Sequence, residues 1–345
     1  MSRYAEAHKV ANLRGAGDAR PTAIQVIEDE DLTGKLSDKV FLITGVSSGI
    51  GAETMRALHT TGAHVYGTVR DIAKGQKVVD AILTESHPSG GKITLIDMSL
   101  DNLASIRRGA ADFLSKSNNT LHLLVANAGI MATPYGKTTD GFETQFGTNH
   151  LAHFLLFQLL KPALLASATP TYASRVVSVT STGHQFGPPL FDDYNFEATP
   201  YDPWRAYGQS KTANIWLANS IESHFGSQNL HATSVHPGLI TSSNLGSHLP
   251  AEQSAMFYQP EVQKTAKSVE QGAATQVWAA VGQEWKDKGG RYLSNMADAL
   301  STEEKAKEEG MTYMANDGYH AWAYDKEGAE RLWRESFGLV GLNLE

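Results

Sequence analysis

Two residues of the segment AYGQSK (206–211), Tyr207 and Lys211, have types and a spacing that could transfer a proton. They are four positions apart, so on a helix they would lie one turn apart on the same face. A phenol with a pKa of about 10 is a poor acid–base group at neutral pH, but a nearby ammonium stabilises the phenolate and moves the pKa toward the working range. A chain of 345 residues also contains chance pairs at this spacing, so the elements around the pair must decide.

A glycine-rich segment, TGVSSGIG (44–51), lies where an apolar run gives way to a helical stretch. Gly45 would permit a tight turn, Gly49 would let the backbone approach a pyrophosphate, and Gly51 would allow close contact between helix and strand. The N-terminus of the helix would offer its N–H groups to the phosphates. The residues expected to hold a dinucleotide here are Gly45, Ser47, Ser48, Gly49, Ile50 and Gly51.

Short apolar runs alternate with helical stretches from residue 39 to about residue 300. This alternation predicts an α/β fold with a Rossmann-type, doubly wound parallel β-sheet of about seven strands, flanked by helices in three αβα layers. Ligands bind such sheets at the carboxyl ends of the strands. We expect strands at 39–45, 63–70, 92–98, 121–129, 174–181, 231–238 and 290–295, and helices at 49–61, 72–85, 100–116, 140–166, 207–225 and 269–282.

The composition divides the chain into three parts. Residues 1–38 form a polar extension with a short helix expected at 22–31, residues 39–300 form the nucleotide-binding domain, and residues 301–345 form a helical tail. Within the domain, residues 242–268 interrupt the alternation with two prolines and many polar residues. Such a segment at the edge of the crevice favours a substrate lid, with a simple surface excursion as the alternative.

The ends of the second, third and fourth strands carry further candidate contacts to the nucleotide. An arginine after the second strand tolerates the 2′-phosphate of NADP, whereas an acidic residue selects NAD. Arg70 therefore favours NADP(H), while the adjacent Asp71 leaves NAD(H) open. Asp97 is placed to accept a hydrogen bond from the adenine amino group. The small residues of Asn127-Ala128-Gly129 would let the adenine ribose and the nicotinamide lie against the backbone.

In order along the chain, these segments resemble the landmarks of the short-chain dehydrogenase/reductase family over roughly residues 38–300. The matching features are TGVSSGIG (44–51), Asp97, NAG (127–129), Asn149, Ser181, YGQSK (207–211) and Pro237-Gly238. Within the family, the chain most resembles the branch of the retinol dehydrogenases and the WW-domain oxidoreductase, with its fungal biosynthetic relatives. That likeness is carried by AGIMATP (128–134), FGTNHLAHFLL (146–156) and RLWRES (331–336).

The resemblance implies an NADP(H)-dependent oxidoreductase that interconverts a ketone or aldehyde with an alcohol. Tyr207 would supply or take the proton, helped by the positive nicotinamide, and Lys211 would hold the ribose hydroxyls. Ser181 would hydrogen-bond the substrate oxygen, and Asn149 would hold a water that links Lys211 to solvent. In the alternative interpretation both residues are purely structural: Ser181 is a turn residue, and the Asn149 side chain only makes hydrogen bonds within its helix. The loop after the sixth strand would meet the nicotinamide carboxamide through Pro237, Gly238, Ile240, Thr241 and Ser242.

Ser181 and Tyr207 are 26 positions apart, which leaves room for an insert rich in aromatic residues and prolines. We expect this insert to roof the pocket and, with the lid, to favour a bulky, partly apolar substrate such as a secondary metabolite. The aromatic and Met side chains concerned are Phe186, Phe191, Tyr194, Phe196 and Trp204 in the roof, and Met256, Phe257 and Tyr258 in the lid. Membrane-bound retinol dehydrogenases begin with an anchor helix, and the polar residues 1–38 do not form one.

Composition narrows the remaining possibilities. A net charge of −8 and a pI near 5.9 argue against nucleic acid or an anionic membrane as partner. Without cysteine there is no disulfide, thiolate metal site or cysteine nucleophile. No run of 18 apolar residues and no secretory signal is found, which predicts a cytoplasmic protein without a membrane span. No histidine falls in a metal-binding pattern, so no metal is expected, and His150 and His153 are assigned to helix packing rather than to the pocket. A homodimer is possible through the helices around 151–165 and 207–225.

Two further functional hypotheses stay open on sequence alone. The fold and cofactor site could serve a non-redox step, such as an isomerisation, elimination or cyclisation. Alternatively, a cofactor-bound sensor or scaffold could act through a partner.

Overall fold

The computed structural model describes residues 2–85, 90–309 and 316–344. They form one eight-stranded sheet with the strand order β3-β2-β1-β4-β5-β6-β7-β8. The first seven strands pair in parallel, and β8 pairs antiparallel to β7. The strands are β1 (Val40–Thr44), β2 (His64–Val69), β3 (Ile93–Asp97), β4 (Leu123–Ala126), β5 (Ser174–Val179), β6 (Leu230–His236), β7 (Tyr292–Ser294) and β8 (Ala297–Asp298).

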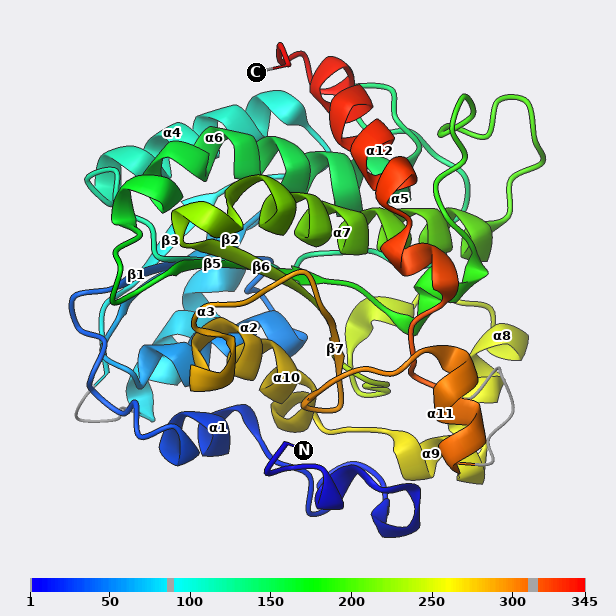
Figure 1. The fold of residues 1–345 in the computed structure, drawn as a ribbon, viewed down its shortest axis with the longest axis horizontal. Coiled ribbons are helices and arrows are strands. Elements are labelled where there is room, and N and C mark those ends of the chain that lie inside the picture. Colours follow the sequence, from blue (N-terminus) through cyan, green and yellow to red (C-terminus); the bar gives the residue numbers. More distant parts are fainter. Residues whose placement is uncertain (1, 86–89, 310–315, 345) are drawn as a thin grey trace.

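Helices cover both faces of the sheet, which confirms the predicted three-layer Rossmann-type fold (Figure 1). One face carries α4, α6, α7 and α12, and the other carries α1, α2, α3 and α10. The central strands β1, β4 and β6 are buried along almost their whole length, and β1 and β4 are almost wholly apolar, as expected for a parallel sheet with both faces covered. The helices are α1 (Ala23–Asp29), α2 (Gly49–His59), α3 (Ile72–Thr84), α4 (Leu103–Lys116), α5 (Thr144–Phe146), α6 (Ala152–Ser167), α7 (Pro203–Phe225), α8 (Ala251–Ala255), α9 (Pro260–Thr265), α10 (Val269–Val281), α11 (Thr302–Glu309) and α12 (Lys326–Leu339).

Three elements differ from the sequence-based prediction. Helix α7 begins at Pro203, four residues early, because Asp202 caps it through the Arg205 N–H and proline suits the first helical position. The helix predicted from 140 to 166 begins only at α5, and a π-helical turn, Gly147–Leu151, separates α5 from α6. The additional strand β8 is two residues long, too short to leave a periodic signal.

The polar N-terminal segment is packed onto the domain rather than extended from it. Helix α1 is capped by Thr22, and Val26 and Ile27 are buried in the same core as α2 and α10. Arg20 is 4% exposed and donates hydrogen bonds to the Thr265 and Ala266 carbonyl oxygens. The N-terminal segment therefore holds the end of the 242–268 segment in place.

Candidate active site

The predicted site residues meet along one edge of the sheet. The glycine loop follows β1, Asn127 follows β4, Ser181 follows β5 and Pro237 follows β6. These four strands are neighbours in the sheet, and the order of strands reverses between β1 and β4. Carboxyl ends of neighbouring parallel strands at such a reversal form the ligand-binding edge of doubly wound folds. The tertiary structure thus brings together segments that lie far apart in the sequence.

The glycine loop has the geometry of a nucleotide cradle. Gly45 and Gly49 have φ angles of +73° and +60°, which favour glycine. A Cβ on Gly49 would meet no atom within 4 Å, whereas one on Gly51 would clash with the Gly45 carbonyl oxygen and with Asn127 Nδ2. Ser48 begins α2 without a side-chain cap. The free N–H groups and the open space beside Gly49 therefore fit a dinucleotide phosphate.

Thr44 and Asn127 connect this loop to the end of β4. The Thr44 hydroxyl accepts the backbone N–H groups of Asn127 and Ala128 at 2.9 and 3.0 Å, and Asn127 Nδ2 donates to the Thr44 carbonyl oxygen at 2.9 Å. A Cβ on Gly45 would lie 2.7 Å from that of Ala128. Gly45 has no room for a side chain because the two loops approach closely. The predicted room for the ribose and nicotinamide at the NAG segment stays a prediction.

Asn149 lies in the π-helical turn, and both ends of its amide are used. Its Oδ1 accepts the Ile130 N–H at 2.9 Å, while Nδ2 donates to the Ile130 carbonyl oxygen and to the Ser210 hydroxyl, each at 2.9 Å. These bonds tie the backbone after Gly129 to α7. π-turns frequently occur at functional sites, and this one turns Asn149 toward the sheet edge.

Tyr207 is buried beside Ser181. The 3-10 turn Thr182–Phe186 follows Ser181, and a Cβ on its Gly183 would lie only 2.5 Å from the Tyr207 ring. Burial raises the pKa of Tyr207 to about 12, and a hydrogen bond with Ser181 acts in the opposite direction. The phenol is therefore neutral and in contact with the serine.

Lys211 lies at the same place, with its Nζ 5.6 Å from the Tyr207 ring centroid. The Nζ donates to the Val179 carbonyl oxygen at 3.2 Å, and a Cβ on Gly129 would lie 3.3 Å from it. Burial lowers the pKa of Lys211 to about 8. In the protein without nucleotide, burial and the Ser181 hydrogen bond are the two causes that shift the Tyr207 pKa. The predicted effect of Lys211 together with the positively charged nicotinamide stays a prediction.

The residues after β2 and β3 are exposed. Asp71 caps α3, since its carboxylate accepts the Lys74 N–H at 3.0 Å. Arg70 is exposed, and Asp97 is exposed at the end of β3, paired in register with Val69. Asp71 thus has a structural partner in α3, and Arg70 is an exposed cation beside it.

The loop after β6 contains a residue that the sequence did not single out. Gly238 has a φ of +95°, and a Cβ there would lie 2.8 Å from the Lys267 side chain. Lys267 is 2% exposed, and its Nζ has no hydrogen-bond partner in the described part of the chain. Burial, with Arg20 nearby, lowers the pKa of Lys267 to about 7. Lys267 lies in the polar 242–268 segment, where the sequence indicates a surface residue, so no sequence pattern marks it as buried.

Only part of the predicted aromatic roof lies near Tyr207. The Trp204 ring is 6.3 Å from those of Tyr207 and Phe257 and 5.7 Å from that of Phe186. Trp204 therefore links Tyr207 to both the insert and the 242–268 segment.

The remaining roof residues do not make ring contacts to Tyr207 or Trp204 among the described residues. Phe191 stacks on Trp216, Tyr194 stacks on Phe146, and Phe196 packs on Tyr201. Phe191 and Tyr194 pack against the core of the α6 and α7 layer. A place for these three side chains in the roof stays a prediction.

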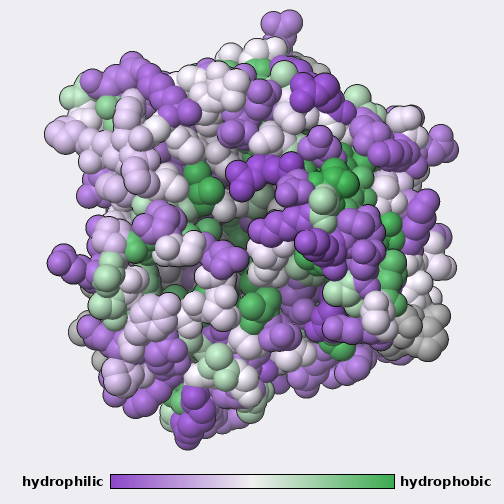
Figure 2. Space-filling model, turned by 180° about the vertical axis from the view of Figure 1, so that it is seen from behind, coloured by the Kyte–Doolittle hydropathy of each residue, from purple (hydrophilic) through white to green (hydrophobic). Residues whose placement is uncertain are grey.

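Apolar side chains are also exposed in the insert and in the 242–268 segment. Phe186, Met256 and Tyr258 are 46%, 49% and 62% exposed. On the face opposite to Figure 1, hydrophobic residues appear as several small groups between polar ones, around a hollow near the centre (Figure 2). The surface is therefore not covered by one continuous apolar patch on this face.

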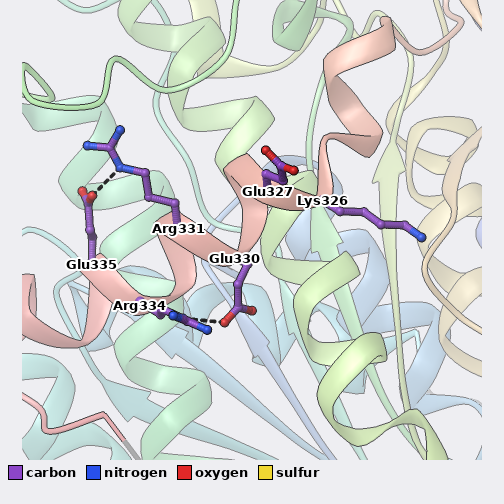
Figure 3. Close-up of a pocket in the computed structure, with 6 residues that line it drawn as sticks. All are labelled: Lys326, Glu327, Glu330, Arg331, Arg334 and Glu335. Atoms are coloured by element: carbon purple, nitrogen blue, oxygen red, sulfur yellow. Dashed lines mark hydrogen bonds and ion pairs between the residues drawn. The ribbon is translucent and has the colours of Figure 1, made fainter.

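A separate depression runs along α12 and contains none of the predicted site residues (Figure 3). It is lined by charged side chains, two pairs of which form ion pairs, Arg331 with Glu335 and Arg334 with Glu330. His150 and His153 are buried in packing roles, as predicted, with bonds to Ser336 and Thr44. Residues 2–85, 90–309 and 316–344 contain no group of three acidic or histidine side chains that could hold a metal ion, and no helix among them is long and apolar enough to cross a membrane.

Comparison with known proteins agrees with this geometry. The family model of short chain dehydrogenases matches residues 39–253. The chain is 44% identical to oxidoreductase calI of Penicillium decumbens, over 100% of this chain and 99% of that protein. It is 34% identical to mouse retinol dehydrogenase 12, over 90% and 89% of the two chains. A crystal structure of an uncharacterised protein from Mycobacterium paratuberculosis aligns over 98% of both chains with a TM-score of 0.65 and 28% identity. The family resemblance seen in the sequence is therefore confirmed: the chain belongs to the short-chain dehydrogenase/reductase family of oxidoreductases.

Proposed function

We propose that this protein is an NADP(H)-dependent oxidoreductase that interconverts a ketone or aldehyde with an alcohol. The observation that carries the proposal is the meeting of Asn149, Ser181, Tyr207 and Lys211 at one sheet edge, beside a helix N-terminus that no side chain caps. When bound, the nicotinamide supplies or accepts the hydride. Holding both reactants at this edge contributes on the order of 7–11 kcal/mol to lowering the barrier.

The protein's own groups handle the proton. Tyr207 is neutral at neutral pH, so in the reductive direction its O–H can donate to the oxygen of the reacting carbonyl. The Ser181 hydroxyl donates a hydrogen bond to the same oxygen as negative charge develops on it. Lys211, next to Gly129, holds the ribose hydroxyls and stabilises the phenolate that remains.

NADP(H) is the proposed cofactor, with NAD(H) the weaker alternative. Support comes from the corner after β2, where Asp71 caps α3 and Arg70 is exposed. A guanidinium binds a phosphate through parallel hydrogen bonds and full charge, so Arg70 suits the 2′-phosphate.

The substrate we propose is bulky and partly apolar, in keeping with a role in secondary metabolism. Trp204 forms an aromatic wall between Tyr207 and Phe257 of the 242–268 segment, which we propose acts as the lid. The predicted cytoplasmic location and homodimer stay predictions from the sequence.

Consumption of NADPH with a panel of bulky ketones and aldehydes tests the proposal. Tyr207→Phe should lower kcat roughly 100-fold or more, because it removes the acid–base group. Tyr66→Phe is the matched control: Tyr66 is a buried tyrosine on β2 whose hydroxyl donates to the Lys116 carbonyl oxygen at 2.9 Å. If Tyr207→Phe turned over the substrate as fast as Tyr66→Phe, the proposed mechanism would be wrong. Tight NADPH binding without oxidation by any substrate would favour the non-redox or scaffold hypothesis.

A further inference from the structure

His184 lies directly behind the proposed catalytic serine. It is in the turn Thr182–Phe186 and is fully buried. Its Nδ1 lies 2.7 Å from the Ser181 carbonyl oxygen, and its Nε2 lies 3.1 Å from the backbone N–H of His320. Both bonds form only when Nδ1 carries the proton and Nε2 accepts. Burial lowers the pKa of His184 to about 4, which keeps this neutral form at neutral pH.

The same turn is held by the C-terminal segment 316–324, here termed the C-terminal clamp. The Trp322 indole N–H donates to the His184 carbonyl oxygen at 3.0 Å. The Gln185 side chain donates to the carbonyl oxygens of Asn316 and Gly318 at 3.1 and 2.9 Å. Four residues of the clamp therefore contact the turn, the fourth being His320 through its backbone N–H.

The clamp also binds helix α7, which carries Tyr207 and Lys211. Trp216 of α7 donates its indole N–H to the Trp322 carbonyl oxygen at 2.8 Å, and Asn219 donates to the Ala323 carbonyl oxygen at 2.9 Å. Trp322 is therefore bonded on one side to the Ser181 turn and on the other to α7. It adds a second connection to the direct bond between the two elements, in which the Thr212 hydroxyl donates to the His184 carbonyl oxygen at 3.1 Å.

The turn packs tightly against the Tyr207 ring, so the turn has little room to shift. The Gly183 N–H donates to the Ser181 hydroxyl at 3.0 Å, and Gly183 packs so closely on the Tyr207 ring that a Cβ would not fit. A shift of the turn would therefore move the Ser181 hydroxyl relative to Tyr207 directly.

We propose that His184 is a positioning residue for Ser181, and that the C-terminal clamp is a working part of the active site. The clamp lies outside residues 39–253, the part of the chain that the family model matches. The inference rests on the roles of Ser181 and Tyr207 proposed above. In it, the His320–His184–Ser181 chain of hydrogen bonds holds the serine hydroxyl in place for the reacting oxygen.

A double-mutant cycle between His184→Phe and Ser181→Ala tests this coupling. Phenylalanine keeps the ring that packs 5.1 Å from the Tyr292 ring but removes both hydrogen bonds. Since each buried group left unpaired has a substantial cost, we expect kcat to fall roughly ten- to 100-fold, with the NADPH Kd changed less than about threefold. On the Ser181→Ala background, His184→Phe should lower kcat by less than about threefold. Equal losses on both backgrounds would show a merely structural role and overturn the proposal.

Trp322→Phe provides a milder variant if His184→Phe does not fold. It keeps the ring stacked on His320 and leaves the His184 carbonyl oxygen bonded to the Thr212 hydroxyl at 3.1 Å. We expect kcat to fall roughly three- to tenfold, whereas Trp285→Phe, a buried tryptophan outside the clamp, should leave kcat unchanged. Wild-type kcat in Trp322→Phe would overturn the role of the clamp.

A readout without turnover separates this inference from the proposed reaction. The ionisation of Tyr207 is measured by ultraviolet difference titration of each protein against its Tyr207→Phe counterpart, with NADP⁺ bound. Because the Ser181 bond lowers the Tyr207 pKa, both Ser181→Ala and His184→Phe should raise it. A raised Tyr207 pKa in Ser181→Ala but not in His184→Phe would refute the role of His184, even if no substrate were turned over. Active Tyr207→Phe protein would instead refute the proposed function.

Discussion

The glycine loop allows one prediction that separates nucleotide binding from folding. Gly49 and Gly51 are two positions apart and both would be changed to alanine. At Gly49 a methyl group meets no protein atom within 4 Å, and the cost to the free protein comes from the backbone alone, with φ at +60°. At Gly51 the methyl group clashes with the Gly45 carbonyl oxygen and with Asn127 Nδ2, which is itself bonded to the Thr44 carbonyl oxygen.

The magnitudes differ for physical reasons. A left-handed alanine costs roughly 1–2 kcal/mol, so Gly49→Ala should lower the free energy of unfolding by about that amount. For Gly51→Ala, helix α2 must move away from β1, and overpacking of this kind costs roughly 1–3 kcal/mol. If the pyrophosphate lies against Gly49, the added methyl group displaces it from the N–H groups of α2. Loss of two charge-assisted hydrogen bonds, worth roughly 3 kcal/mol together, raises the NADPH Kd on the order of 100-fold.

The assay combines NADPH fluorescence titration with thermal unfolding, each without and with nucleotide. A ligand present at 100 times its Kd stabilises wild type by about 2.7 kcal/mol, and Gly49→Ala should lose most of this gain. Gly141→Ala is the matched control, because Gly141 also has a positive φ of +89° and open space around it but lies in another loop.

Two results would refute the reasoning. An NADPH Kd for Gly49→Ala within threefold of the Gly141→Ala value would show that the phosphates do not lie on this loop. A Gly51→Ala protein with the thermal stability of wild type would show that the contact between α2 and β1 is less tight than the geometry indicates.

Two further predictions concern charged side chains. Arg70→Ala should raise the Kd for NADPH roughly tenfold and leave the Kd for NADH unchanged. Arg108→Ala, which changes an exposed arginine on α4, is the control. Equal effects on the two Kd values would show that Arg70 does not bind the 2′-phosphate. Lys267 has a folded-state pKa of about 7, depressed by burial and by Arg20 and Lys305 against a small opposing effect of Asp18. The unfolded chain therefore binds more protons between pH 7 and about 10, and this lysine makes stability rise with pH in that window, by at most about 1.4 kcal/mol per pH unit. Lys267→Met should be at least as stable as wild type at pH 7, and its Tm should rise less from pH 7 to 9. An unchanged dependence of Tm on pH would contradict a buried, unpaired amine at this position.

Much of the fold was readable from the sequence because it depends on local patterns. Apolar runs of the length of a strand, alternating with helical stretches, predict a parallel sheet with helices on both faces, and that sheet is found. The glycines at 45, 49 and 51 are informative because a positive φ or a close contact restricts those positions to one residue type. The departures, at the starts of α5 and α7 and in the π-turn, fall where capping or tertiary hydrogen bonds outweigh periodicity.

The sequence by itself determined the order of the strands along the chain and the residue types at the carboxyl edge, including the pair Tyr207 and Lys211. It did not determine their electrostatics, because solvation depends on the atoms that surround a group in three dimensions. Only the tertiary structure shows that burial raises the Tyr207 pKa and lowers that of Lys211. It also decided two hydrogen-bond partners of His184, His320 and Trp322, which lie more than 130 positions away. Hydrogen bonds over such distances leave no periodic signal in the sequence, since they depend on how the layers pack and not on the spacing of residues along the chain.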